Sequence, residues 1–503
     1  MVWGKAGSTT LTSTGDTLAV SGMTASKFNQ VMSNIILSSN SVAGKYTFNN
    51  NTGSNYAYSN SYNGATDGTG VNQPNSGTVW QTLDSAGEES FQIMYSCSIS
   101  GQEKLSMFFN VDNDAGTGGV APNRREGVFK YIQTADISSV ELNNTGSGDY
   151  AVDTNLSVLG SDLTPAVTTP AIPAFPALMP SLQSPSVGGW VELARTTLGS
   201  SGSTIDVTSI PDKRYYMVLR NILTASADVR EGFNSDTGSN YARRYSANGG
   251  SDVTSGNDTI IGLNYSAGDK FIVDYISNIS SKEKLVLSSS SEEGTAGAGN
   301  APNRMEVVGK WANTSNVINE INTSLSGGSY NTGTECVVLG WDDSDTHTTN
   351  FWEELASVQG DGTSTTLSSG TITAKKYLWV QVYADTATSA CGFQFNNDTG
   401  ANYARRYNMN GGSDGTQESH TSANISGSST KAFINCFIIN NSANEKLLMC
   451  NTVYANASGA GNYPERSEDY SKWANTSSQI TEIDVIKGSN WGSNSIIKVW
   501  GSN

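Results

Sequence analysis

FNSDTGSNYARRYSANGGSD, residues 233–252, returns almost letter for letter as FNNDTGANYARRYNMNGGSD, residues 395–414. The two stretches begin 162 residues apart, and the same distance separates KWANTS at Lys310 from KWANTS at Lys472. Several landmarks at one offset, without a net insertion between them, identify a tandem repeat. The chain therefore contains at least two copies of one structural unit.

A third and more diverged copy precedes these two. FNNNTGSNYAY starts at Phe48 and resembles the quoted stretches. EKL starts at Glu103 and again at Glu283, 180 residues later, and APNR starts at Ala121 and again at Ala301, also 180 residues later. The whole chain of 503 residues is thus accounted for by three repeats and their connections.

We expect the first repeat, which we predict to be an anchor, at residues 1–162, a proline-rich linker at 163–189, the second repeat at 190–341, a short linker at 342–350 and the third repeat at 351–503. The longer linker favours an extended, polyproline-like spacer. The predicted plan is one module, a spacer, and then a closely coupled pair.

Within each repeat the sequence is typical of short strands. In KKYLWVQVYAD, Tyr377 and Trp379 alternate with Leu378 and Val380, the period of two that a strand requires. Gly is abundant, at 52 residues, and charged residues make up only 15 %, a composition that favours strands joined by tight polar turns. We predict an all-β protein of three tandem antiparallel, jelly-roll-like β-sandwich repeats with a proline-rich strut after the first.

The charge balance excludes two classes of partner. The formal net charge is -17, from 29 basic and 46 acidic residues, and such a surface repels nucleic-acid phosphates and anionic membranes. No stretch reaches the length of a membrane span, and the first sixteen residues do not resemble a signal peptide. We therefore expect no nucleic-acid partner, no membrane insertion and no export leader.

The five cysteines do not recur at matching repeat positions. A disulfide framework would be expected to repeat with the domain, so the sequence predicts buried, reduced thiols. These cysteines are Cys97, Cys336, Cys391, Cys436 and Cys450.

The stretch NYARRY is the strongest candidate for a binding site. Read as a strand, it places every second side chain on one face. The candidate ligand-binding residues are Tyr241, Arg243 and Tyr245 in the second repeat, with Tyr403, Arg405 and Tyr407 in the third. Three interpretations stay open: a structural edge of the sandwich, a surface that stacks on sugar rings, and a protein–protein contact.

The first repeat bears on that choice. It keeps Tyr56 and Tyr58 but has Ala57 and Ser59 around the second of them, so the double arginine is missing. The fold does not require both arginines, and one interpretation is that the second and third repeats share a task that the first lacks. A structural ion pair lost together with its partner would leave the same pattern.

Enzymatic chemistry is not expected. Only two histidines exist, His347 and His420, and neither recurs, which removes most triads and zinc sites. The repeated acids Glu283 and Glu445 belong to the repeating framework rather than to one specialised place. The acidic turns NVDNDAGTGG and WDDSDTH lack the spacing and terminal Glu of an EF-hand loop. We predict no catalytic residue, no metal site and no cofactor.

FN(N/S)DTG(S/A)NYARRY and KWANTS, with the Gly/Ser/Asn-rich modules, the proline-rich strut and the acidic charge, resemble repeat-bearing virion proteins of tailed viruses. The resemblance covers the whole chain. It implies a fibre, spike or capsid-decoration protein on the virion surface, made in the host cytoplasm. Implied partners are other virion proteins, further copies of the chain with a trimer favoured, and a host-surface glycan bound by the distal repeats.

Two alternatives stand beside this interpretation. One is a secreted or cell-surface, lectin-like adhesin of a microbe, which an export signal would favour. The other is an architectural shell protein without a ligand.

Overall fold

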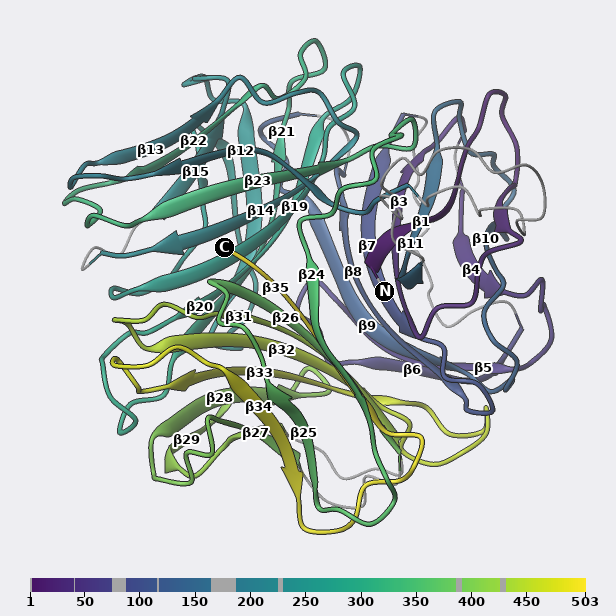
Figure 1. Cartoon of the computed structure of the whole chain (residues 1–503). Coiled ribbons are helices and arrows are strands. Elements are labelled where there is room, and N and C mark those ends of the chain that lie inside the picture. Colours follow the sequence, from purple (N-terminus) through teal and green to yellow (C-terminus); the bar gives the residue numbers. More distant parts are fainter. Residues whose placement is uncertain are drawn as a thin grey trace, which may run out of the picture.

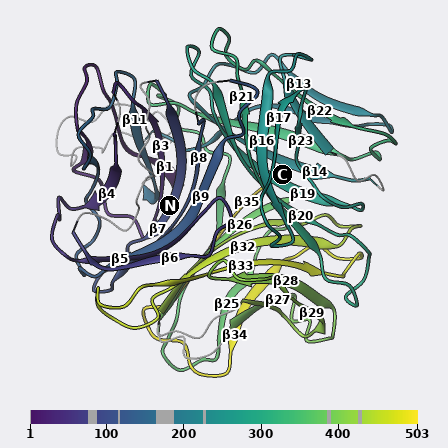
Figure 2. The same ribbon diagram turned by 180° about the vertical axis from the view of Figure 1, so that it is seen from behind.

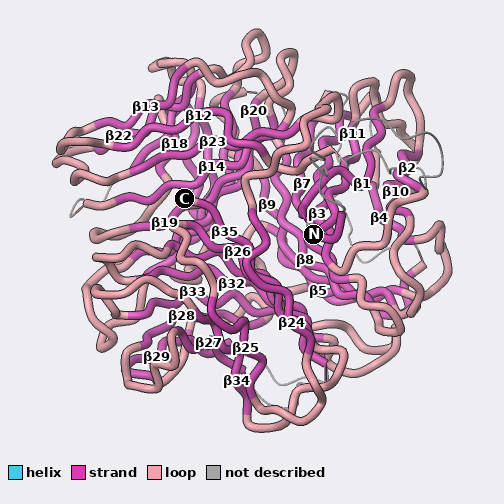
Figure 3. Tube along the Cα trace, viewed as in Figure 1, coloured by secondary structure: helices cyan, strands magenta, loops and turns pink. Residues whose placement is uncertain are grey.

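The structure, a computed structural model, describes residues 2–39, 41–74, 87–114, 117–163, 187–224, 229–385, 391–425 and 431–503. Throughout these ranges the regular elements are strands (Figure 3), and they form three antiparallel β-sandwiches. The predicted all-β fold of three tandem sandwich repeats is confirmed. The predicted proline-rich linker lies, apart from its ends, outside the described residues. In the described part of the chain, no helix has the length and apolar character to cross a bilayer.

The first sandwich is built from β1 (Val2–Thr10), β2 (Thr17–Ser21), β3 (Phe28–Ile36), β4 (Gly44–Phe48), β5 (Tyr56–Tyr62), β6 (Gly68–Gln73), β7 (Glu89–Cys97), β8 (Lys104–Asp112), β9 (Asn123–Tyr131), β10 (Ser139–Asn144) and β11 (Asn155–Leu163). An eight-stranded sheet has the order β1-β11-β3-β7-β8-β9-β5-β6. A three-stranded sheet, β2-β10-β4, covers one of its faces.

The second sandwich is built from β12 (Val191–Thr197), β13 (Thr204–Thr208), β14 (Tyr215–Ile222), β15 (Val229–Phe233), β16 (Tyr241–Ala247), β17 (Val253–Asp258), β18 (Ile261–Gly262), β19 (Lys270–Ser277), β20 (Lys284–Glu292), β21 (Asn303–Trp311), β22 (Glu320–Leu325) and β23 (Glu335–Trp341). Its large sheet is β12-β23-β14-β19-β20-β21-β16-β17, and its small sheet is β13-β22-β15-β18. The strand order of the large sheet matches that of the first repeat.

The third sandwich is built from β24 (Glu353–Gln359), β25 (Thr366–Thr371), β26 (Tyr377–Asp385), β27 (Cys391–Phe395), β28 (Tyr403–Met409), β29 (Gly415–His420), β30 (Ala423–Ile425), β31 (Lys431–Ile439), β32 (Lys446–Tyr454), β33 (Glu465–Trp473), β34 (Glu482–Lys487) and β35 (Ile496–Ser502). The sheets are β24-β35-β26-β31-β32-β33-β28-β29 and β25-β34-β27-β30. In all three repeats the first strand pairs with the last, so both ends of each repeat lie at one edge of its large sheet.

The large sheets are buried on both faces, because each contributes to two cores. In β26, Leu378 and Val380 point into the third sandwich, whereas Tyr377 and Trp379 point the other way. The second set joins a core that also contains Trp3 from the first repeat and side chains from the second. The predicted alternation is confirmed, and its aromatic side faces the other repeats rather than solvent.

The three repeats therefore surround a common axis, as the three lobes of Figures 1 and 2 show. β8, β20 and β32, one from each large sheet, contact one another pairwise. Trp3 stacks on Trp379 with ring centroids 4.4 Å apart, which joins the first repeat directly to the third. One chain thus forms a pseudo-threefold assembly with a shared hydrophobic core.

This packing corrects the predicted plan of a separate module followed by a close pair. The first repeat packs against the other two as they pack against each other, side by side around the axis. The physical reason lies in the large sheet, whose outer face carries Phe28, Phe91 and Met107 and would expose them to water if the repeat stood alone. The length of a proline-rich connection limits the distance between two modules but does not determine where they pack.

The prediction that all cysteines are reduced is wrong for two of them. Cys436 in β31 lies directly across from Cys450 in β32, with the Cα atoms 4.1 Å apart, and the two form a disulfide. The other three cysteines are free and buried. The corresponding positions of the second repeat hold Asp274 and Ser288. The bridge belongs to one repeat only, which is why a search for a repeating framework missed it.

Thiol counting tests this bridge. We expect an alkylating reagent to label Cys97, Cys336 and Cys391 in the denatured, unreduced protein, and all five cysteines after reduction, as read by mass spectrometry. Replacing the bridge with Cys436→Ala and Cys450→Ala is expected to lower the free energy of unfolding by about 3 kcal/mol, the usual value for a loop of this length. Labelling of all five without reduction would contradict the assignment.

Candidate functional site

The repeated stretch quoted above forms one edge region of the large sheets, in β16 and β28. Tyr241 at the start of β16 is fully buried, stacks on Trp311, and accepts a hydrogen bond of 3.0 Å from the backbone N–H of Phe233. Tyr403 makes the corresponding contact with Phe395, also at 3.0 Å. These first tyrosines of NYARRY therefore belong to the sandwich cores, and neither phenol reaches the surface.

The DTG turn and the KW motif are joined in each repeat. Asp236 accepts hydrogen bonds from the N–H of Gly238 at 2.8 Å and from Nε1 of Trp311 at 2.7 Å. In the first repeat these places are taken by Asn51 and Tyr131, which bond to each other through their side chains. The acid and the indole change together because they are hydrogen-bond partners. This acid is a structural part of the turn.

Arg243 and Tyr245 lie on the same face of β16 as Tyr241, as predicted from the alternation. That face points toward the small sheet, where Arg243 donates a hydrogen bond of 3.0 Å to the carbonyl of Gly262. Its guanidinium lies over the ring of Tyr245, 4.8 Å from the centroid. Both side chains are half-buried and reach the rim of a hollow of about 230 Å³ that Tyr265 also lines.

Arg405 and Tyr407 repeat the stacking, at 4.2 Å, but in a different electrostatic setting. Arg405 is 6 % exposed and forms an ion pair of 2.9 Å with Asp469. The second repeat has Val307 in place of that acid, and the nearest carboxylate oxygen to Arg243 belongs to Asp258, 4.0 Å away. The two arginines predicted as equivalent are therefore neutralised to different degrees.

The second arginine of each pair faces the neighbouring repeat. Arg244 donates from Nε to the carbonyl of Pro122 at 2.9 Å and lies within 3.5 Å of the side-chain oxygen of Asn123. Arg406 donates to the carbonyl of Pro302 at the same distance of 2.9 Å. Each of these arginines holds the APNR loop of the preceding repeat, so this half of the motif is an inter-repeat contact.

The first repeat lacks this arginine, and the loop at the corresponding junction differs from APNR. Ser59 stands in the place of Arg244 and donates to Asp67 at 2.8 Å. The loop that it faces, in the third repeat, reads YPER, so Glu465 replaces the Asn123 of APNR. The second arginine and the asparagine near it are thus absent together at this junction, but the contact that they make elsewhere is a hydrogen bond and not the ion pair that the sequence left open.

The arginine of each APNR or YPER loop closes a ring around the axis. Arg124 of the first repeat pairs with Asp252 of the second at 2.8 Å. Arg304 pairs in the same way with Asp414 at 2.9 Å, so each acid comes from the NGGSD turn of the next repeat. The third junction, which returns to the first repeat, joins Arg466 to Asp67 at 2.9 Å.

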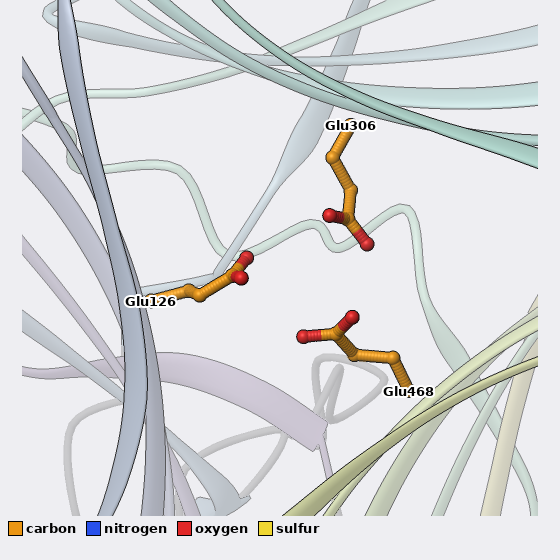
Figure 4. A group of neighbouring side chains, drawn as sticks. All are labelled: Glu126, Glu306 and Glu468. Atoms are coloured by element: carbon orange, nitrogen blue, oxygen red, sulfur yellow. The ribbon is translucent and has the colours of Figure 1, made fainter. Parts of the chain in front are cut away.

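Three glutamates converge inside this ring, Glu126, Glu306 and Glu468 (Figure 4). Each pairs with an arginine from a neighbouring repeat: Arg124 with Glu306 at 3.0 Å, Arg304 with Glu468 at 2.7 Å and Arg466 with Glu126 at 3.2 Å. The three guanidiniums supply the positive charge that a bound cation would bring. We therefore assign the cluster to repeat association and not to metal binding.

The glutamates differ in their ionisation. Burial raises the pKa of Glu306 to about 8, more than the nearby Arg304 lowers it. Burial acts on Glu468 in the same direction, but Arg466 and Arg304 outweigh it and hold the pKa of that carboxyl below its usual range. Removing any member of such a buried ring leaves a charge that is not fully compensated. The ring therefore favours the one arrangement of the three repeats in which all members are paired.

EKL and KW form a second contact at each junction. Lys310 lies 3.7 Å from Glu283 of its own repeat and donates a hydrogen bond of 2.6 Å to the carbonyl of Asn113 in the first repeat. The corresponding bonds at the other junctions are Lys472 to the carbonyl of Thr295 at 2.5 Å and Lys130 to the carbonyl of Ala455 at 3.0 Å. The most strongly repeated charged residues thus connect the repeats.

The pH dependence of stability tests the contact that Glu89 of the first repeat makes with the second repeat. It lies in β7, opposite Lys282 of the second repeat at 3.9 Å, and burial raises its pKa from 4.5 to about 8 in spite of that lysine. Between pH 4.5 and about pH 8, the Glu89 carboxyl keeps its proton in the folded protein but has lost it in the unfolded chain. The free energy of unfolding therefore falls as the pH rises through this range, by at most about 1.4 kcal/mol per pH unit.

We expect Glu89→Gln to remove this contribution. Chemical denaturation at pH 5.5 and pH 8 should show a smaller decline for the variant than for the wild type, and the variant should be the more stable protein at pH 8. Parallel declines in the two proteins would show that Glu89 is ionised in the folded state.

Comparison with known proteins adds little. No protein-family model and no curated protein matches the chain. Among solved structures, it is similar to domains LG4-5 of the mouse laminin alpha1 chain, with 12 % identity over 65 % of this chain and 88 % of that one and a TM-score of 0.16. It is also similar to OccK11 (OpdR) of Pseudomonas aeruginosa, with 9 % identity over 93 % of this chain and 100 % of that one and a TM-score of 0.11. Scores this low establish no common fold.

Sequence reasoning missed the ring residues Arg124, Arg304 and Arg466 and their acidic partners. A signal was present, since this arginine and the Asp after the NGG turn recur in the repeats. The sequence NGGSD is in itself typical of a tight turn, and a single repeat gives no hint that its Asp has a partner in another repeat.

Proposed function

We propose that the protein is a non-enzymatic structural protein of the virion surface, of the fibre, spike or capsid-decoration type. The observation that carries the proposal is the closed ring of three sandwiches with one shared core. The most strongly repeated charged residues act in holding that ring together, as expected for a building block. Other virion proteins and further copies of the chain, a trimer being favoured, are the partners that this proposal implies.

The virion location rests on the resemblance of the repeats to virion proteins and on the acidic, strand-rich composition. Under this proposal the protein is made in the host cytoplasm and leaves the cell with the particle. The first repeat is the proposed anchor, because it alone lacks the Tyr-Arg pair corresponding to Arg243 and Tyr245.

Glycan binding by the distal repeats is the second part of the proposal. It is supported by the hollow that Arg243 and Tyr245 reach, with Tyr265 exposed beside it. Aromatic rings and charged hydrogen-bond donors at one surface hollow suit the apolar faces and hydroxyl groups of sugars. Multiple copies on one particle would add avidity to a weak single site.

One observation favours the adhesin alternative, namely the disulfide between Cys436 and Cys450. Disulfides persist in oxidising surroundings outside the cell. A protein exported by a microbe meets that condition during its synthesis, whereas a virion protein meets it only after release.

Immunogold electron microscopy of the producing culture, with an antibody against residues 187–503, separates these functions. We expect label on virus particles, over the head for a decoration protein or at a tail or spike for a receptor-binding one. Label on cell envelopes with unmarked particles would overturn the virion proposal in favour of the adhesin.

A further inference from the structure

We propose that two hollows on either side of Tyr265 form one groove that binds an acidic oligosaccharide. The inference rests on the proposed glycan binding and names the ligand class and the site. Its parts are the hollow of about 230 Å³ in the second repeat and a cleft of about 500 Å³ at the junction with the third.

Tyr265 links the two hollows. Its side chain is 57 % exposed, the largest exposure among the large hydrophobic and aromatic residues in the described ranges. Tyr265 and Asn264 line the smaller hollow, and the next residues, Ser266 and Ala267, line the cleft. An exposed ring between two polar hollows is placed to stack on a sugar while the flanking sugars enter the hollows.

The smaller hollow favours an anion. Arg243 lines it with a side chain that is 24 % exposed, and Asp258 approaches this guanidinium only to 4.0 Å. Nη1 donates to the carbonyl of Gly262, which is uncharged and does not neutralise the guanidinium. A carboxylate or sulfate at the exposed part of the guanidinium would accept a charge-assisted hydrogen bond from it.

The cleft suits the uncharged part of a sugar chain. Hydroxyl and amide side chains make up much of its wall, among them Ser266, Thr295, Asn300, Asn303 and Thr416. Two charged side chains also line it, Arg406, whose guanidinium already holds the carbonyl of Pro302, and Glu418, whose carboxylate would repel an acidic group and so favours a neutral sugar here. Amides and hydroxyls can donate to and accept from sugar hydroxyls, without a preference for charge.

The third repeat does not reproduce the groove. Asp469 neutralises Arg405, Gly392 stands where the second repeat has Arg230, and the sequence places Gly427 at the position of Tyr265. The six residues predicted as two equivalent sites therefore reduce to Arg243 and Tyr245, and the proposal adds Tyr265 to them.

Calorimetric titration of the full chain tests the groove. The acidic probes are oligogalacturonate and carrageenan oligosaccharide, and their neutral counterparts are methyl-esterified oligogalacturonate and desulfated carrageenan. We expect at least one acidic probe to bind, with its neutral counterpart at least about tenfold weaker. Tyr265→Ala should weaken binding about tenfold, and Arg243→Gln should abolish the preference for the acidic form.

The matched control is Tyr463→Ala, which removes a tyrosine that is 39 % exposed in the loop facing the first repeat. It should bind like the wild type, and all variants should keep the wild-type melting temperature. Binding that Tyr265→Ala leaves unchanged, equal binding of neutral and acidic probes, or no binding of any probe would each overturn the groove. None of these outcomes bears on particle labelling, so the virion proposal stands or fails separately.

Discussion

Arg304→Met is expected to lower the free energy of unfolding by about 3 to 5 kcal/mol, the cost of breaking a buried ion pair from one side. The Arg304 side chain is 3 % exposed and pairs with Asp414 at 2.9 Å and with Glu468 at 2.7 Å, both in the third repeat. Methionine fills much of the volume but removes one cation from two buried carboxylates, which leaves Glu468 with Arg466 alone and Asp414 with Arg406 at 3.8 Å. Urea denaturation followed by tryptophan fluorescence measures the loss.

Lys375→Met is the matched control. Lys375 pairs with Glu353 at 2.9 Å, but the side chain of that acid is 64 % exposed, and exposed pairs contribute about 0 to 1 kcal/mol. We expect the control to stay within about 1 kcal/mol of the wild type. An Arg304→Met variant as stable as this control would mean that the axial ring does not hold the repeats together.

Trp3→Ala is expected to destabilise the third repeat, although Trp3 belongs to the first. Trp3 is fully buried, stacks on Trp379 at 4.4 Å and lies 5.4 Å from the ring of Trp500. Truncating a buried tryptophan costs about 3 to 5 kcal/mol, and here the cavity opens against β26 and β35. Native-state hydrogen exchange should show faster exchange of the amides in those two strands.

Leu18→Ala provides the comparison, because Leu18 is equally buried but lies inside the first sandwich. It should speed exchange in the first repeat more than in β26 and β35. If Trp3→Ala affected only the first repeat, the shared core would contribute nothing to the stability of its neighbours.

Much of the fold could be predicted from the sequence, because repeat offsets and strand periodicity are local signals. The alternation of Tyr377 and Trp379 with Leu378 and Val380 placed two apolar sets on opposite faces of one strand. The alternation alone does not show that other repeats cover the outer set. An apolar face has the same sequence pattern whichever surface it packs against. The shared core is a property of three sheets together.

The candidate site was predictable only in part, for a related reason. Arg243 and Arg244 are neighbours in sequence, and the alternation correctly separated their faces. Which face contacts the next repeat depends on the ring, where Arg244 meets Asn123. In the first repeat Ser59 replaces this arginine, and in the YPER loop Glu465 replaces this asparagine. Comparing each repeat with the loop of its neighbour, rather than with its own counterpart, would have revealed that paired change.

Small-angle X-ray scattering of the intact chain tests most directly whether the three repeats form one closed unit. A compact protein of 503 residues should have a radius of gyration of about 23 Å, with a single peak in its pair-distance distribution. We predict that result. A clearly larger radius with separate peaks, as expected for a first repeat held away on an extended proline-rich linker, would contradict the pseudo-threefold assembly.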